Sequence, residues 1–273
     1  MRTMEIINDT QTNILSLLAR FKFLVISQIV PLLDKSIGYV RIQLAKLAKT
    51  GYIKSMQLNR PGKAENMYYL TESGKELILQ HAKVFDDDIK LPIGVPLVVK
   101  DYSHRKSMIS LTIVLYYHFA GLGITVKESI SYFDKQGDNR KLGNLKARTK
   151  LPLGNGFFIP DGIMITDNGE EQTVWLVEMY CDNSSTRVIS QILTKHLVCI
   201  AEGSTAAKFG IQANPFVLSC FANSGVKNKV IERLATNEMF KPFQHLFFFA
   251  SLEEIQRDSK AWQTINGNKI VYT

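Results

Sequence analysis

The sequence predicts an α/β (α+β) protein in which a small helical segment with a hairpin precedes a larger mixed sheet covered by helices. Two patterns predict this class. Apolar residues recur at helical spacing in several stretches, and short, nearly continuous apolar runs of strand type separate the later stretches. In addition, 45% of the 273 residues are apolar, which is enough for packed cores.

Residues 1–85 contain three predicted helices. The stretch 11–20 has its apolar residues on one face, Ser27 can cap a short second helix that ends at Leu33, and Ser36 caps a third helix to about Lys49. In the third helix we expect Ile37, Val40, Leu44 and Leu47 to pack inward. The opposite face then presents Tyr39, Arg41, Gln43, Lys46 and Lys49.

A hairpin and a fourth helix follow. Residues 52–58 and 67–70 are predicted strands joined by a basic turn that carries Arg60 and Lys63, and a helix is expected from 75 to about 83. Three helices and this hairpin, with Gly-Tyr-Ile at 51–53 and Tyr-Tyr-Leu-Thr-Glu-Ser-Gly from 68, resemble a winged helix-turn-helix domain.

That resemblance implies a double-stranded DNA-binding domain whose third helix enters the major groove and whose wing contacts phosphates. The residues it places near DNA are Ser36, Tyr39, Arg41, Gln43, Lys46, Arg60 and Lys63. The alternative is a dimerisation or docking module, since winged helices also serve that purpose.

The net charge of +8 is concentrated in the first part of the chain. Residues 1–150 hold 23 Lys and Arg against 13 Asp and Glu, whereas residues 151–273 hold 10 against 12. This asymmetry indicates binding to a polyanion, with a simple solubility bias as the alternative. The basic loop 136–150 is either a solvated loop or a track for nucleic acid; its cations include Arg140, Lys141, Lys146 and Arg148.

An acidic run at 86–88 and the prolines at 92 and 96 interrupt every periodicity. We therefore predict a DNA-binding domain at 1–85, a linker at 86–100 and a second domain at 101–273. The second domain is predicted to contain helices at 103–120, 184–201, 226–239 and from 252, and strands at 124–133, 157–165, 174–180, 215–221 and 245–250. This order predicts a mixed sheet with helices on its faces.

Two of these strands each carry one acid, Asp161 and Glu178, and the polar linker between them contains Asn168-Gly169, a strong hairpin signal. Adjacent antiparallel strands would hold the two carboxylates side by side. Buried acids are costly unless they are paired or bind a metal, so the sequence predicts a site for Mg²⁺ or Mn²⁺. Such an ion could support phosphodiester cleavage.

Pro160-Asp161 on one strand and Glu178 on the next resemble the PD-(D/E)xK nuclease fold over about residues 101–250. The resemblance implies that both acids bind metal and that a Lys stands two residues after the Glu. Here that position is Tyr180. Three explanations stay open: Lys195 supplies the cation from the next helix, on the face it shares with Gln191; Tyr180 acts itself; or the site is inactive.

Two further residues have open roles. Glu128, at the centre of the strand 124–133, is either a third metal ligand or one partner of a surface salt bridge. His104, at the start of the helix 103–120, is either a site residue or an ordinary surface histidine.

Taken in order, the winged helix, His104, Asp161, Glu178 and the helix with Lys195 resemble the replication-relaxation proteins and the MobC-type plasmid mobilisation relaxases. The resemblance implies a metal-dependent DNA endonuclease or nickase that acts at a plasmid transfer or replication origin. Expected partners are duplex DNA, relaxosome or replication proteins, and a second copy of the chain. The alternatives are a non-catalytic DNA-binding regulator and a restriction- or transposon-type endonuclease.

The remaining features indicate the compartment. The chain has three cysteines without metal-type spacing, no apolar run long enough to span a membrane, and acids near its first residue. We therefore expect a cytoplasmic protein with no membrane partner.

Overall fold

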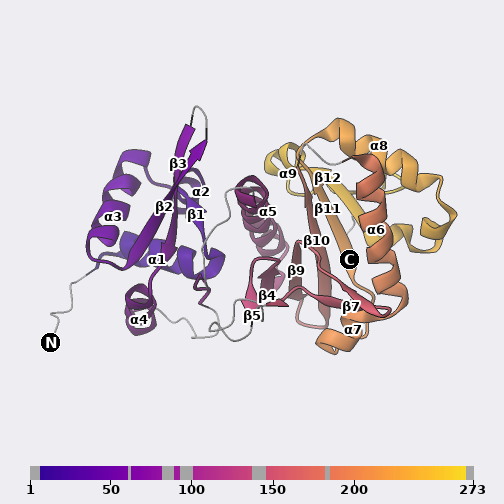
Figure 1. The fold of residues 1–273 in the computed structure, drawn as a ribbon, viewed down its shortest axis with the longest axis horizontal. Helices are drawn as coiled ribbons and strands as arrows, with labels where there is room; N and C mark the ends of the chain where they lie inside the picture. Colours follow the sequence, from indigo (N-terminus) through magenta and orange to yellow (C-terminus); the bar gives the residue numbers. More distant parts are fainter. Residues whose placement is uncertain are drawn as a thin grey trace. The chain divides into compact units, whose positions relative to one another are not determined.

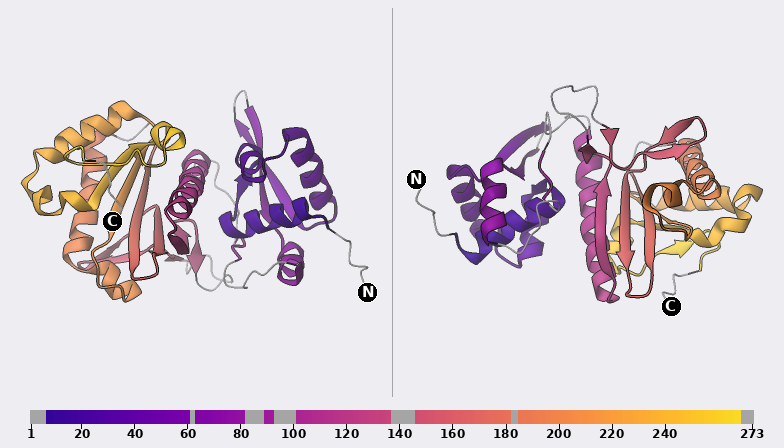
Figure 2. Two further views of the ribbon diagram at one scale, coloured as in Figure 1. Left: turned by 180° about the vertical axis from the view of Figure 1, so that it is seen from behind. Right: turned by 90° about the horizontal axis from the view of Figure 1, so that it is seen from below.

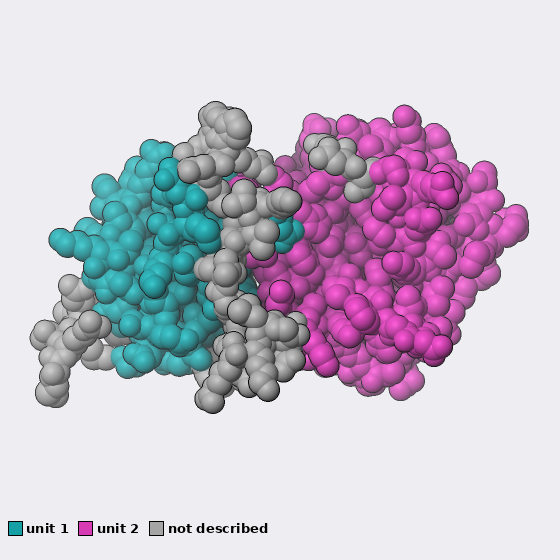
Figure 3. Space-filling view, viewed as in Figure 1, with its two compact units in different colours: residues 1–101 teal, residues 102–273 magenta. Residues whose placement is uncertain are grey.

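The protein is described here from a computed structural model that covers residues 7–60, 63–81, 89–92, 101–136, 146–181 and 185–268. The chain divides into two compact units, residues 1–101 and 102–273 (Figure 3). This division falls at the end of the predicted linker. The predicted class, a mixed α/β protein with a large mixed sheet in its second part, is confirmed. Among the described residues, no helix combines the length and apolarity needed to cross a bilayer.

Unit 1 consists of helices around a three-stranded sheet of order β1-β3-β2, with antiparallel pairs throughout (Figure 1). Its elements are α1 (Asp9–Phe21), β1 (Leu24–Val25), α2 (Ile26–Leu33), α3 (Ile37–Lys49), β2 (Ile53–Arg60), β3 (Lys63–Leu70) and α4 (Glu72–His81). The core of the unit comes from the apolar faces of these helices, including Leu18, Ile29 and Leu44. The three helices and the hairpin therefore form in the predicted order.

Two residues of α3 differ in burial from the prediction. Ile37, expected to be buried, is 49% exposed, whereas Gln43, expected on the DNA-facing side, is 3% exposed. The Gln43 side chain accepts a hydrogen bond from Asn8 Nδ2 at 3.4 Å. Because this bond satisfies part of the buried amide, Gln43 joins the core with Val40 and Leu44, and its predicted DNA contact is wrong.

The Thr-Glu-Ser-Gly motif has a clear structural reason. Thr71 Oγ1 donates to the carbonyl oxygens of Gly51 and Tyr52 and accepts from the backbone N–H of Gly74 in the first turn of α4. A Cβ atom at Gly74 would lie 2.1 Å from the carbonyl oxygen of Tyr52. A glycine is needed there because the first turn of α4 lies directly against the backbone before β2.

Unit 2 is built on a six-stranded sheet of order β13-β12-β11-β10-β9-β4. The three strands β10, β11 and β12 are parallel to one another, and the remaining pairs are antiparallel. The main elements are α5 (Tyr102–Gly121), β4 (Thr125–Ser131), β9 (Gly162–Asp167), β10 (Gln172–Tyr180), α6 (Thr186–Ala201), β11 (Phe216–Phe221), α8 (Ser224–Ala235), β12 (Phe247–Ser251), α9 (Leu252–Arg257) and β13 (Gln263–Thr264).

Helices cover both faces of this sheet. Helices α5 and α9 lie on one face, and α6 and α8 lie on the other (Figures 1 and 2). Trp175 packs on Phe119 of α5, with ring centroids 5.1 Å apart, whereas Leu176 belongs to the core under α6. Successive residues of β10 therefore face opposite helices, as the alternation of a strand requires.

Several small elements were not predicted. They are β1, β13, β5 (Lys135–Gln136), β6 (Lys146–Ala147), β7 (Leu151–Leu153), α7 (Ser204–Phe209) and the 3₁₀ segment η4 (Glu238–Leu246). The expected strand at 157–165 is in fact two strands, β8 (Gly156–Phe158) and β9. Pro160 lies in the break between them, and it has no N–H group to donate to a ladder. Asp161 therefore precedes β9 and does not lie within a strand.

The β9–β10 hairpin forms as predicted, and local geometry fixes its turn. Asn168 Oδ1 accepts from the backbone N–H groups of Glu170 and Glu171, and Gly169 has a φ of +94° that favours glycine. At the other end of β9, a Cβ atom on Gly162 would lie 2.4 Å from Cε of Met108. This glycine lets α5 approach the sheet beside Asp161.

Candidate functional site

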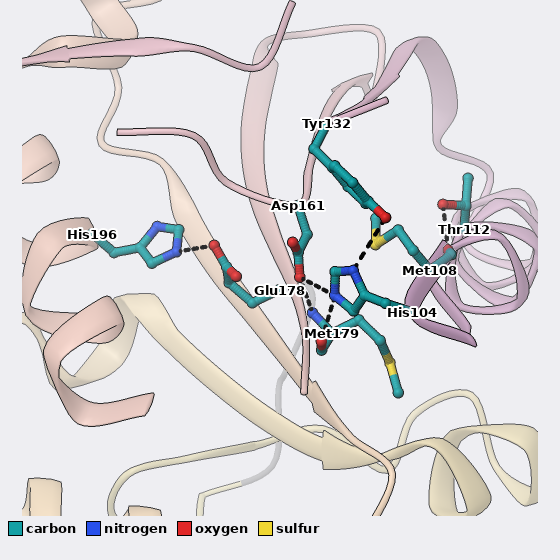
Figure 4. A network of polar contacts seen from close by, with 8 residues as sticks. All are labelled: His104, Met108, Thr112, Tyr132, Asp161, Glu178, Met179 and His196. Atoms are coloured by element: carbon teal, nitrogen blue, oxygen red, sulfur yellow. Dashed lines mark hydrogen bonds and ion pairs between the residues drawn. The ribbon is translucent and has the colours of Figure 1, made fainter. Parts of the chain in front are cut away.

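The two predicted acids lie side by side at one end of the β9–β10 hairpin (Figure 4). Gly162 lies opposite Val177 in the register, so the next positions along the two chains bring Asp161 beside Glu178. Glu178, on β10, is 4% exposed, whereas the side chain of Asp161 is 18% exposed. The pair therefore has one buried carboxyl group and one that reaches the surface.

His104, near the start of α5, helps to hold Asp161 in place. Its Nε2 lies 3.0 Å from Oδ2 of Asp161 and 2.9 Å from the carbonyl oxygen of Met179. The backbone N–H of Met179 donates to the same Oδ2 at 2.9 Å. On the other side of the imidazole, Nδ1 lies 3.3 Å from the hydroxyl oxygen of Tyr132. His104 is therefore part of the site and not an ordinary surface histidine.

His196 contacts Glu178, as His104 contacts Asp161. It lies on the buried face of α6, and its Nε2 is 2.7 Å from Oε1 of Glu178. The ring of Phe158 meets it edge-on, with centroids 4.6 Å apart. Within the described residues, Nδ1 of His196 has no hydrogen-bond partner. The imidazole is thus fixed by one polar contact and by packing.

Burial dominates the electrostatics of this second pair. Burial, and then the negative charge of the neighbouring Asp161, raise the pKa of Glu178 well above its ordinary value. Burial lowers the pKa of His196 to about 3. Both shifts favour the neutral forms, so a protonated Glu178 donates its hydrogen bond to a bare Nε2 of His196. A cation next to Glu178 would act in the opposite direction and favour the carboxylate.

The residues around the acid pair meet the minimum for Mg²⁺ or Mn²⁺. Mg²⁺ is commonly held by one or two carboxylates and completes its coordination with water and substrate phosphate. His104 and the N–H of Met179 contact Oδ2 of Asp161, and His196 contacts Oε1 of Glu178. In the described ranges, no group of three or more His, Cys, Asp or Glu side chains is arranged to hold a metal.

Lys195 and Tyr180 were the two residues predicted to replace the missing lysine. Neither places a cation or a reactive hydroxyl group at the acid pair. Lys195 and Gln191 both lie on the exposed side of α6, and it is the neighbouring His196 that faces Glu178. Tyr180 is buried beside Phe221, and burial raises the pKa of its hydroxyl well above the usual value. We therefore assign no chemical step to Tyr180.

Glu128 lies away from the pair. It pairs with Ile165 on β9, whereas the site end of β4 is Ser131, opposite Gly162. Its Oε1 accepts from Arg148 Nη2 at 2.6 Å, which is the salt-bridge alternative, so the metal-ligand role for Glu128 is not supported. Of the other cations in the basic loop, Lys146 is exposed, and Arg140 and Lys141 lie outside the described residues.

In unit 1, the predicted DNA-facing residues of α3 are exposed with the exception of Gln43, which is buried. Ser36 caps the helix by accepting from the N–H of Tyr39, and Tyr39, Arg41 and Lys46 are exposed. Arg60 and Lys63 are paired across the ends of β2 and β3, and their side chains lie outside the described part of the chain.

Sequence reasoning missed two members of the site. His196 left a usable signal, because it continues the apolar face formed by Ile189 and Leu193 on α6, where a polar residue needs a buried partner. Tyr132 gave no signal in the sequence, because its contact with His104 joins the end of β4 to α5 across 28 residues.

Comparisons of the chain with protein-family models, curated proteins and solved structures found no match.

Proposed function

We propose that this protein binds double-stranded DNA through a winged helix-turn-helix domain in residues 1–85 and cleaves one strand with a PD-(D/E)xK-like domain in residues 101–273. The observation that carries the proposal is the juxtaposition of Asp161 and Glu178, each contacted by an imidazole, at the ends of two central strands of a mixed sheet. Two adjacent carboxyl groups, of which Asp161 reaches the surface, suit a Mg²⁺- or Mn²⁺-dependent phosphodiester reaction.

The exposed side of α3 supports the DNA-binding part. Helix α3 contains no acidic residue and presents Arg41 and Lys46 together with the apolar side chains of Ile37 and Ile42. Cations can contact phosphates and guanine edges, and apolar groups can contact thymine methyl groups. This combination on one helix suits insertion into a major groove.

In the cleavage reaction, Asp161 and Glu178 would hold the divalent ion. When bound, such an ion polarises the phosphate and lowers the pKa of a bound water molecule. The chain's own residues prepare the site: His104 and the N–H of Met179 fix Asp161, and His196 fixes Glu178. Outer contacts of this kind orient metal ligands and commonly change metal affinity 10- to 100-fold when lost.

The biological setting that we propose follows from the resemblance to the replication-relaxation and MobC-type mobilisation proteins. The protein would nick a plasmid transfer or replication origin in the cytoplasm, together with relaxosome or replication proteins or with a second copy of itself. The order of the winged helix, His104, Asp161, Glu178 and the helix of Lys195 supports this setting.

Nicking of a supercoiled plasmid tests the proposal. Purified protein is incubated with plasmid carrying its own element's origin, with Mg²⁺, Mn²⁺ or EDTA. We expect open circles with either metal, none with EDTA, and none with Asp161→Asn. The control is Glu253→Gln, because Glu253 is an exposed acid of α9 far along the chain from the pair.

A non-catalytic DNA-binding regulator is the second candidate. It is favoured by the absence of the expected lysine after Glu178 and by the exposed position of Lys195 on α6. Intact supercoils at every protein concentration, with DNA binding that Asp161→Asn leaves unchanged, would establish this alternative.

A further inference from the structure

Two buried hydroxyl groups lie on the same sheet face as Glu178. Ser219 on β11 lies directly opposite Glu178 in the parallel register, and Tyr180 follows Glu178 by two residues on β10. Residues in register, and residues two apart along a strand, project from the same face of a sheet. This face is covered by α6, whose His196 contacts Glu178. Glu178, Tyr180 and Ser219 therefore form one polar group beside the apolar core under α6.

The hydroxyl group of Tyr180 lies near Ser219 and near the acid pair. The ring of Tyr180 lies 4.9 Å, between centroids, from the ring of Phe221, which follows Ser219 by two residues on β11. Burial is the main cause that raises the pKa of the Tyr180 hydroxyl, and the charges of Glu178 and Asp161 raise it further. The Ser219 side chain acts in the opposite direction, as a neighbouring polar group does.

Neither hydroxyl group has a hydrogen-bond partner within the described part of the chain. The hydroxyl oxygens of Tyr180 and Ser219 are both buried, and the two groups do not meet the geometry of a hydrogen bond with each other. A buried hydroxyl without a partner has lost its hydrogen bonds to bulk water and gained none in return, which costs free energy. Two such groups next to a carboxyl group are an arrangement that binds an internal water molecule.

We propose that Tyr180 and Ser219 bind one internal water molecule beside Glu178. A buried water molecule makes about three hydrogen bonds to polar groups that otherwise lack partners. In this site the two hydroxyl groups supply two of these bonds, and the carboxyl group of Glu178 supplies another. A hydroxyl hydrogen can rotate, so Tyr180 and Ser219 can each donate to the water or accept from it.

The water molecule gives Tyr180 a positioning role, which rests on the proposed function. A carboxylate that binds a metal ion is itself held by hydrogen bonds from outer groups. The water can donate such a bond to Glu178 while Tyr180 and Ser219 hold the water in place. Tyr180 occupies the position at which the PD-(D/E)xK pattern has its lysine. Here that position contributes a hydroxyl group that acts on Glu178 through the water and takes no part in the chemical step.

A high-resolution crystal structure of the full chain without metal tests the water site. We expect a water molecule at about 2.7–2.8 Å from the hydroxyl oxygens of both Tyr180 and Ser219. We expect its loss in the double variant Tyr180→Phe/Ser219→Ala. A direct hydrogen bond between the two hydroxyl groups, with no water between them, would overturn the inference and leave the proposed function standing.

Thermal stability gives a second readout that needs neither DNA nor metal. Tyr180→Phe and Ser219→Ala each remove a partner of the water, so we expect each to lower the midpoint of unfolding of unit 2. The double variant should lose less than the two single losses together, because both act on the same water. The control is Tyr117→Phe, an exposed residue of α5, which should leave the midpoint unchanged. If no water is bound, each change removes an unpaired buried group, so unchanged or raised midpoints in both variants would overturn the inference.

The affinity for Mn²⁺, measured by titration calorimetry, tests the positioning role. We expect Tyr180→Phe and Ser219→Ala each to weaken binding by ~10-fold or more, and Tyr117→Phe to leave it unchanged. Wild-type affinity in both variants would overturn the positioning role while the proposed function stands. If the wild type binds no Mn²⁺ but the crystal shows the water, the proposed function fails and the water site is retained.

Discussion

At the scale of single residues, Glu178 and His196 form a buried pair in which the neutral forms are favoured. In the unfolded chain, Glu178 titrates near 4.5 and His196 near 6.5. The raised pKa of Glu178 makes stability fall as the pH rises from 4.5 towards the folded pKa of Glu178, and the lowered pKa of His196 makes stability fall as the pH drops from 6.5 to about 3. The two effects oppose each other where these ranges overlap.

Outside the overlap each effect acts alone, which gives a testable pH profile. On the alkaline side, stability falls as the pH rises towards the raised pKa of Glu178. Below pH 4.5 the unfolded chain binds a second proton, whereas folded His196 is protonated only near pH 3. Stability therefore falls as the pH drops through this range. Urea denaturation across this range measures both slopes.

The matched variant for this profile is Glu178→Gln, which imitates the protonated carboxyl group and can still donate to His196. We expect it to remove the loss of stability on the alkaline side of the profile. Equal alkaline slopes in the wild type and in Glu178→Gln would contradict the assignment of a neutral Glu178.

A divalent ion at the acid pair should change this behaviour. Ion binding needs both carboxylates deprotonated, so affinity should rise with pH. At a concentration about 100 times its Kd, Mg²⁺ or Mn²⁺ would stabilise the fold by about 2.7 kcal/mol. We expect a larger increase in thermal stability at pH 8 than at pH 5, measured by calorimetry, and no increase in Asp161→Asn. An equal shift in Asp161→Asn would place the ion elsewhere.

At the scale of elements, the start of α4 depends on one glycine. In Gly74→Ala the new Cβ would lie 2.1 Å from the backbone oxygen of Tyr52, which cannot move without displacing β2. We expect a loss of ~1–3 kcal/mol in the free energy of unfolding of unit 1, measured by urea denaturation. Glu76→Ala, an exposed change in the same helix, is the control, and an equal loss there would refute the explanation.

Helix α3 gives the prediction for DNA binding. Arg41→Ala and Lys46→Ala should each weaken binding and reduce the slope of log affinity against log salt by about 1, because each removes a phosphate contact. Gln43→Ala should instead destabilise unit 1, because Gln43 is buried against Asn8. Fluorescence anisotropy at several salt concentrations checks this, with the exposed Lys229→Ala of α8 as the control. Unchanged slopes for both α3 variants would remove this helix from the DNA contact.

The same helix shows how far the sequence could predict the elements. The spacing of Val40, Leu44 and Leu47 correctly located the helix and most of its buried face. Polarity alone placed Gln43 outside and Ile37 inside, and both placements were wrong. The deciding contact comes from Asn8, 35 residues earlier, and no local pattern reveals it.

The site shows the same limit. The hairpin signal at Asn168-Gly169 and the apolar strands sufficed to bring Asp161 and Glu178 together. The two histidines that orient these acids come from helices on opposite faces of the sheet, so their contacts arise from the tertiary fold. Residue spacing shows that Lys195 and Gln191 share one face of α6, but it does not show which face of this helix is buried. The choice of Lys195 as the cation near the pair therefore depended on an assumption about that face.

At the scale of the whole molecule, the two compact units each have their own buried core. We therefore expect thermal unfolding in two transitions, because separate cores unfold as separate cooperative units. Gly74→Ala should lower one transition, and Mg²⁺ or Mn²⁺ should raise the other. A single transition that both changes shift together would contradict this independence.

In the proposed active protein, Asp161 and Glu178 share one divalent ion. Anomalous diffraction from crystals of the full chain soaked in Mn²⁺ tests this sharing directly. We predict one strong anomalous peak between the two carboxyl groups, at about 2.0–2.2 Å from an oxygen of each, and its loss in Asp161→Asn. A soaked crystal with no peak at this position, or with Mn²⁺ bound at other residues, would contradict the account.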